Sequence, residues 1–184
     1  MKLIAKARDV AFPPPVEIIY CYGVWQPAFK QLANTVTLHE GMIDVRSEIP
    51  SDGENRWLII DDLMQEAGGS ETDAIYTKFS HHKNVSVFFI VQNLFAKHIR
   101  TISLNTHYFF LFKNPRDGTT VSSLASQAFP GRVQAVMEAY RDATSSPNSF
   151  LLIDLRQETH DAMRLLGNYA SDEKPMSVYI PKNL

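Results

Sequence analysis

Short runs of apolar residues alternate along the chain with segments in which apolar residues recur every three or four positions. The runs predict β-strands, and the periodic segments predict amphipathic helices. The expected strands are Glu17–Tyr22, Arg56–Asp62, Val85–Val91, His107–Lys113, Phe150–Leu155 and Ser177–Ile180. The expected helices are Met1–Val10, Pro27–Val36, Asp73–His82, Thr120–Ala128, Arg132–Thr144 and Glu158–Asn168, with a short helix or turn at Phe95–Ile99 and a short edge element at Met42–Ile43.

The clearest strand is Arg56–Asp62, in which the residues from Trp57 to Ile60 are all large and apolar. An unbroken apolar run of this length is typical of a strand covered on both faces, as in a parallel sheet between helices. Because strands and helices alternate over the whole length, we expect an α/β fold with a mainly parallel sheet flanked by helices. The sequence has no repeat and no interior linker, so we expect one domain over residues 1–184.

The composition excludes several classes of partner and an internal disulfide. Apolar residues make up 45% of the chain and charged residues 21%, both usual fractions for a globular protein. The net charge is −2, so no overall basic field points to nucleic acid. The longest apolar runs are too short to cross a bilayer, and no membrane partner is expected. The single cysteine, Cys21, excludes an internal disulfide and is compatible with a reducing compartment.

Candidate chemistry lies where two of the expected strands end. Asp61 and Asp62 directly follow the apolar run, and ligand sites in parallel sheets lie at the carboxyl ends of the strands. An acidic pair there can hold a hydrated Mg²⁺ with one carboxylate and polarise a water with the other. Taken alone, the pair is interpreted as a solvated acidic turn. Gln92 ends the next strand, where it either contacts a γ-phosphate, orients a water or only caps the strand.

Five segments, in this order, carry a resemblance to a known family. They are Ile18–Gly23 (IIYCYG), Trp57–Leu63 (WLIIDDL), Phe88–Phe95 (FFIVQNLF), Asn105–Asp117 (NTHYFFLFKNPRD) and Phe150–Leu155 (FLLIDL). Together they resemble the viral genome-packaging ATPases of the FtsK–HerA P-loop type, as found in poxviruses, other large DNA viruses and polinton-like elements. The resemblance covers nearly the whole chain and implies an incomplete P-loop NTPase-like fold of the RecA/ASCE type.

The resemblance implies a role for each polar residue near the strand ends. Asp61 matches the Walker B carboxylate that holds Mg²⁺, Asp62 matches the acidic position that activates the attacking water, and Gln92 matches the polar sensor. Arg100 and Arg116 are the two arginines best placed to act as the family's arginine finger, which reaches a neighbouring subunit's nucleotide, and the sequence does not choose between them. The implied cofactors are Mg²⁺ and ATP, and the implied partners are a homo-oligomeric ring and double-stranded DNA, in a host cell or virion.

One departure from the family pattern dominates. The sequence contains no Gly-x-x-x-x-Gly-Lys-Ser/Thr loop, whose backbone amides and lysine hold the phosphates. Met1–Val10 matches the helix that follows this loop, so we expect an N-terminally truncated domain without the phosphate-loop strand. Such a chain is expected to bind ATP weakly or not at all and not to hydrolyse it at a useful rate, so neither Mg²⁺ nor ATP is expected as a cofactor of the chain alone. The His107–Lys113 strand would then be displaced onto the Val85–Val91 strand, or separated from it by a gap in the sheet.

Three functions therefore stay open. The first is part of a DNA-packaging ATPase that is inactive alone, for which a Gly-Lys-Ser/Thr coding sequence lies upstream. The second is a non-catalytic, ATPase-derived module that binds or assembles with other components. The third is an unrelated α/β enzyme that uses Asp61 and Asp62 as a metal-dependent acid/base pair, which predicts metal binding without nucleotide. The family resemblance favours the first.

Overall fold

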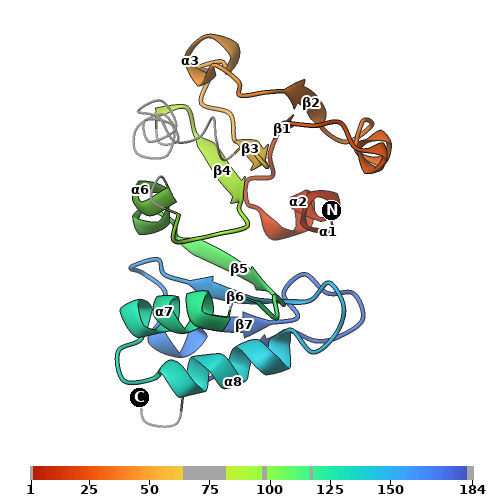
Figure 1. Cartoon of the computed structure of the whole chain (residues 1–184). Helices are drawn as coiled ribbons and strands as arrows, with labels where there is room; N and C mark the ends of the chain where they lie inside the picture. Colours follow the sequence, from red (N-terminus) through yellow and green to blue (C-terminus); the bar gives the residue numbers. More distant parts are fainter. Residues whose placement is uncertain (1, 64–81, 97–98, 117, 182–184) are drawn as a thin grey trace. The chain divides into compact units, whose positions relative to one another are not determined.

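The computed structural model describes residues 2–63, 82–96, 99–116 and 118–181 (Figure 1). The expected helix at Asp73–His82 lies outside the described residues except for His82. The chain divides into two compact units, Met1–Asn105 and Thr106–Leu184, and each has a four-stranded sheet of its own. The expectation of one domain over residues 1–184 stays a prediction.

The first unit is built on a parallel sheet with the strand order β2-β1-β3-β4 (Figure 1). Its strands are β1 (Glu17–Tyr22), β2 (Thr37–Glu40), β3 (Arg56–Asp61) and β4 (Val85–Ile90). All three pairings are parallel, so the predicted α/β class with a parallel sheet is confirmed for this unit. The arrangement is compatible with a P-loop-like or a Rossmann-like fold.

Helical elements cover both faces of this sheet, as the apolar run of β3 predicts. They are α1 (Lys2–Ala5), α2 (Ala7–Val10), the 3₁₀-helix η1 (Pro27–Gln31) and α3 (Val45–Glu48). The same unit also contains α6 (Arg100–Leu104). On one face, side chains of β1 and β3 pack against α1, α2 and η1. On the other face, they pack against α3 and the residues that flank it. Because both faces are packed, β3 is fixed and its carboxyl end has a defined position.

In the first unit, several short elements differ from the prediction. The expected Met1–Val10 helix is two four-residue helices that are separated at Lys6. The expected helix from Pro27 to Val36 is a 3₁₀-helix that ends at Gln31. The edge element is β2 and not Met42–Ile43, because the polar side chains of β2 suit an exposed edge strand. Helices α3 and α6 were not predicted, since four or five residues show no helical period.

The second unit has an antiparallel sheet with the strand order β5-β6-β7-β8. Its elements are β5 (Tyr108–Phe112), α7 (Gly118–Ala128), α8 (Val133–Ala143), β6 (Phe150–Asp154), β7 (Leu165–Gly167) and β8 (Ser177–Val178). The predicted helices near α7 and α8 are confirmed. All three strand pairings are antiparallel, so the expectation of a mainly parallel sheet is wrong for this unit. Apolar runs report burial and do not encode strand direction.

The His107–Lys113 strand is β5 of the second unit. β5 pairs with β6 from Tyr108 opposite Asp154 to Phe112 opposite Phe150. Its position relative to the Val85–Val91 strand, either displaced onto that strand or separated from it by a gap, stays a prediction.

The expected helix at Glu158–Asn168 is also wrong. This segment contains the short 3₁₀-helix η4 (Asp161–Met163) and then β7, which pairs antiparallel with β6. Leu165 and Leu166 are buried in that sheet. The two leucines fit the helical period of the sequence, but they also fit a short strand, and tertiary pairing with β6 selects the strand.

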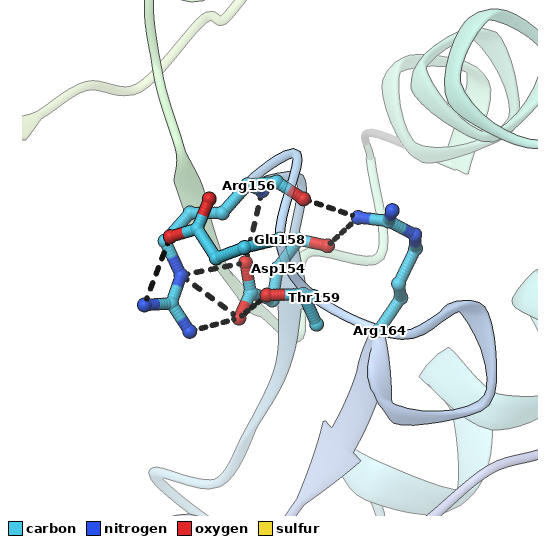
Figure 2. Close-up of polar contacts among 5 residues, drawn as sticks. All are labelled: Asp154, Arg156, Glu158, Thr159 and Arg164. Atoms are coloured by element: carbon cyan, nitrogen blue, oxygen red, sulfur yellow. Dashed lines mark hydrogen bonds and ion pairs between the residues drawn. The ribbon is translucent and has the colours of Figure 1, made fainter.

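A cluster of charged side chains turns the chain back after β6 (Figure 2). The carboxylate of Asp154 accepts hydrogen bonds from the backbone N of Arg156 at 3.0 Å and from Thr159 Oγ1 at 2.9 Å. The guanidinium of Arg156 lies on the same carboxylate, with Nη2 3.0 Å from Oδ2. Arg164 Nη1 donates to the backbone oxygens of Asp154 and Arg156. These bonds compete with helical hydrogen bonds, which explains the turn.

Candidate metal site at the carboxyl edge of the parallel sheet

The carboxyl ends of the four parallel strands meet at one edge of the first sheet. In the register of the sheet, the last residues form one row from Glu40 of β2 through Tyr22 and Asp61 to Ile90 of β4. Asp61 is half-buried, and Asp62, which follows β3, is exposed. The acidic pair therefore lies at the edge where parallel sheets bind ligands.

A tyrosine on the neighbouring strand holds Asp61. Tyr20 of β1 donates a hydrogen bond from its hydroxyl to Asp61 Oδ2 at 2.6 Å. Burial of Tyr20, followed by its hydrogen bond to Asp61, raises the pKa of the tyrosine well above its usual value. The hydroxyl is therefore protonated at neutral pH and acts as the donor, while the carboxylate oxygen accepts.

Asp62 leaves the strand with an uncommon backbone conformation. Its φ is +55°, in the left-handed region that residues with side chains rarely adopt. Gln92 Nε2 lies 3.5 Å from Asp62 Oδ1, at the outer limit of a hydrogen bond. The structure thus brings Asp61, Asp62 and Gln92 together at one edge, and their catalytic roles stay predictions.

The two candidate arginines belong to different units. Arg100 is exposed at the first residue of α6, and no hydrogen bond or ion pair joins it to Asp61 or Asp62 within the described ranges. Arg116 belongs to the second unit, where its backbone N donates to Asn114 Oδ1 at 3.1 Å in the turn before α7. The choice between the two as an arginine finger stays open.

The oxygen atoms of this edge fit Mg²⁺, which proteins bind through one or two carboxylates while water and phosphates complete its shell. Asp61 Oδ2 is bound to Tyr20, and Oδ1 accepts no hydrogen bond from the residues that the structure describes. The described part of the chain contains no group of three or more His, Cys, Asp or Glu side chains that could hold a metal ion. The metal role of Asp61 therefore stays a prediction.

Cys21 lies one strand away from the acidic pair and does not fit the role of a nucleophile. It pairs in register with Ile60 of β3, and its side chain is fully buried. Burial raises the pKa of the thiol to about 11, which keeps it protonated at neutral pH. A protonated thiol is a poor nucleophile.

Sequence reasoning assigned Tyr20 to a strand and missed its contact with Asp61. The alternation of Tyr20, Cys21 and Tyr22 indicates that the two tyrosines share a face. It does not indicate which strand lies beside β1, nor the register that places Tyr20 diagonally from Asp61. Both are tertiary properties, so no local signal identified the contact.

No protein-family model matches the chain, and no curated protein or solved structure is significantly similar to it. None of the described helices is long and apolar enough to cross a membrane. The resemblance to packaging ATPases therefore rests on the order and composition of the five sequence segments.

Proposed function

We propose that the carboxyl edge of the first sheet is the metal-binding and water-activating half of a nucleoside-triphosphate site, in an ATPase-like domain of the DNA-packaging type. Asp61 holds Mg²⁺, Asp62 activates the attacking water, and Gln92 orients that water or contacts the γ-phosphate. The observation that carries the proposal is the position of these three side chains at the ends of the adjacent parallel strands β3 and β4.

The strand order supports this proposal. In the packaging ATPases that the sequence resembles, the phosphate-loop strand lies between the sensor strand and the last strand of the core. β4, which leads to Gln92, pairs with β3 on one side. On its other side, no strand pairs with β4 among the described residues. A phosphate-loop strand added at this edge would bring its loop next to the end of β4, where Gln92 follows the strand.

The residues of the chain supply only part of the chemistry of hydrolysis. The sequence lacks the lysine and the glycine-rich loop that neutralise a triphosphate, and two carboxylates repel the phosphates unless a cation lies between them. We therefore expect the chain alone to hold Mg²⁺ with a dissociation constant on the order of 1 mM or weaker. Because phosphoryl transfer depends on positioning and electrostatic stabilisation, we expect no useful rate of ATP hydrolysis.

The ring and the DNA in this proposal come from the sequence resemblance. In such rings an arginine of one subunit stabilises charge on the γ-phosphate bound to its neighbour. The side chains of Arg100 and Arg116 are both exposed, as a residue that reaches another subunit has to be.

The proposal is tested by measuring phosphate release and metal binding with the full chain. With Mg²⁺ and ATP, we expect phosphate release by the wild type to be no faster than release by Asp62→Asn. With Mn²⁺ as a substitute for Mg²⁺ that electron paramagnetic resonance detects, we expect weak binding that Asp61→Asn abolishes. Glu173→Gln removes an exposed carboxylate from the second unit and is the control that retains Mn²⁺ binding.

The alternative functions give different results in the same experiment. ATP hydrolysis that needs Mg²⁺ and disappears in Asp62→Asn would show that the chain works without a phosphate loop. Tight Mn²⁺ binding that ATP does not change would favour the metal-dependent acid/base enzyme. Mn²⁺ binding that is equal in the wild type and in Asp61→Asn would overturn the proposed metal role.

A further inference from the structure

The second unit contains a cavity that the proposed function does not use. The cavity has a volume of about 240 Å³, and its lining includes the apolar residues Phe129, Leu165 and Pro181 and the charged residues Arg132, Asp161 and Arg164. We propose that this cavity binds a small carboxylate with a short apolar body, and that Arg132 pairs with the carboxylate group. The lining residues all belong to the second unit, so the inference is independent of the metal role of Asp61.

Arg132 supplies a positive charge that lacks an acceptor. Its backbone N donates to the oxygen of Phe129 at 3.0 Å, while its guanidinium makes no hydrogen bond or ion pair with any residue that the structure describes. The residue is partly buried, so its guanidinium has lost part of its hydration. Buried polar groups need partners, and a carboxylate fits the planar fork of N–H groups that arginine presents.

Arg164 is held at the cavity by three hydrogen bonds. Its Nε donates to Asp161 Oδ1 at 2.8 Å, and its Nη1 donates to the backbone oxygens of Asp154 and Arg156 (Figure 2). Its Nη2 makes no hydrogen bond among the described residues. The side chain is 17% exposed. Arg164 is thus a fixed positive group with a spare donor, and fixed groups bind a ligand at a low cost of ordering.

The charge of the cavity indicates the class of anion. Two of the lining residues, Arg132 and Arg164, are positive and one, Asp161, is negative, which leaves a net charge of +1. The hydrogen bond from Arg164, and then the charge of Arg164, lower the pKa of Asp161, with smaller contributions from His160 and Arg132. Asp161 is therefore ionised at neutral pH. A monoanion such as a carboxylate neutralises this lining, whereas a phosphate dianion would place excess negative charge beside Asp161.

The remaining lining sets the size and polarity of the ligand. Phe129 is 8% exposed and Leu165 is 2% exposed, so the cavity has an apolar wall opposite the charged groups in chemical character. The volume lies below the roughly 300–1,000 Å³ of sites for drug-sized ligands, which suits a molecule of few heavy atoms. α8 begins at Val133 without a side-chain cap, so the N–H groups of its first turn add positive potential beside Arg132.

The test is a titration of the full chain with butyrate, followed through backbone amide signals in nuclear magnetic resonance at constant ionic strength. We expect shifts at Phe129, Arg132, Arg164 and Leu165, with a dissociation constant on the order of 1–10 mM. Butyramide has the same apolar body without the charge. We expect it to bind at least roughly tenfold more weakly, the effect of losing a hydrogen bond between charged groups.

Two substitutions should change the affinity for butyrate in opposite directions. Arg132→Gln should weaken binding by roughly tenfold or more. Asp161→Asn removes a carboxylate that repels the ligand and should tighten binding by roughly two- to fivefold, the size of an exposed charge interaction. Arg141→Gln is the matched control, because Arg141 is an exposed arginine on α8 whose Nε donates to the backbone oxygen of Met137. It should leave the dissociation constant unchanged.

The outcomes separate this inference from the proposed function. Equal butyrate binding by the wild type and Arg132→Gln would overturn the inference, and so would shifts confined to residues outside the cavity. Equal binding of butyramide would show an apolar cavity without a carboxylate site. Tighter binding of inorganic phosphate than of butyrate, or weaker binding of butyrate in Asp161→Asn, would refute the charge argument. None of these results bears on Mn²⁺ binding at Asp61, so the two proposals fail separately.

Discussion

Replacing Asp154 with alanine removes the acceptor on which the turn after β6 is built (Figure 2). The residue is 5% exposed, and its carboxylate accepts hydrogen bonds from the backbone and guanidinium of Arg156 and from Thr159. We expect this substitution to lower the free energy of unfolding of the second unit by about 2–4 kcal/mol.

The magnitude follows from the burial of the two ionic partners. A hydrogen bond to a charged group contributes about 1.5–3 kcal/mol, and removing one partner of a buried ion pair costs about 3–5 kcal/mol. The side chain of Arg156 is 40% exposed, so water can solvate its guanidinium after the loss, which lowers the cost. Asp154→Asn keeps the volume and one acceptor oxygen, and we expect about 1–2 kcal/mol for it.

The contribution of Asp154 depends on pH. Burial alone would raise the pKa of this carboxyl, but the hydrogen bonds from Arg156 and Thr159 outweigh burial and hold the pKa below its ordinary 3.8. A carboxylate with a lowered folded-state pKa stabilises the fold above its unfolded pKa and loses this effect as the pH falls through the folded pKa. The stability difference between the wild type and Asp154→Asn should therefore be constant near neutral pH and shrink below about pH 4.

Hydrogen exchange, measured by mass spectrometry on peptides from β6 and β7, is the assay. It follows the second unit without assuming that the whole chain unfolds in one step. A loss of about 2–4 kcal/mol corresponds to exchange that is faster by roughly 30- to 800-fold. Glu158→Gln is the control, because Glu158 is 71% exposed and lies 3.5 Å from Arg156 Nη1, where an ion pair contributes little. Equal exchange in Asp154→Ala and Glu158→Gln would refute the reasoning.

Three further predictions follow from the packing. Leu58→Ala should lower the free energy of unfolding of the first unit by about 2–5 kcal/mol, because Leu58 is fully buried and its loss leaves a cavity. A midpoint of urea unfolding equal to that of the wild type would contradict this prediction. The Cys21 thiol, buried and with its pKa raised to about 11, should react with an aromatic disulfide reagent at pH 8 only after urea unfolds the chain; immediate reaction of the native chain would count against its burial. Gly167→Ala should displace the Tyr179 ring, because the added carbon would lie 2.8 Å from Tyr179 Oη. A crystal structure of the variant should therefore lack the hydrogen bond from Tyr179 to Asp142. A Tyr179 ring in its wild-type position would disprove this prediction.

The sequence predicts those site residues that directly follow a strand. β3 is buried on both faces, which produces the unbroken apolar run that ends at Asp61. Asp61 and Gln92 could be expected at one edge, because parallel strands have their carboxyl ends on the same side. The contact between Tyr20 and Asp61 was not predictable, since strand neighbours and register are set by the whole sheet.

In the second unit, sequence patterns do not predict the direction of neighbouring strands or the turn after β6. Phe150–Leu155 was predicted as a strand because it is apolar and short, and β6 spans Phe150–Asp154, but nothing in the segment specifies an antiparallel neighbour. The expected Glu158–Asn168 helix failed because Asp154 and Arg164 hydrogen-bond to the backbone and side chains of the turn. Such contacts compete with a helix only once the chain has folded back, so helical spacing alone does not reveal them.

The central claim is that Asp61 is a metal ligand at the carboxyl edge of the first sheet, and an anomalous difference map tests it most directly. Crystals of the full chain would be soaked in Mn²⁺, and diffraction would be recorded where Mn²⁺ scatters anomalously. We predict a peak about 2.1 Å from Asp61 Oδ1, with the Tyr20 hydroxyl still bonded to Oδ2. A map with Mn²⁺ bound elsewhere on the chain and no peak at Asp61 would contradict the claim.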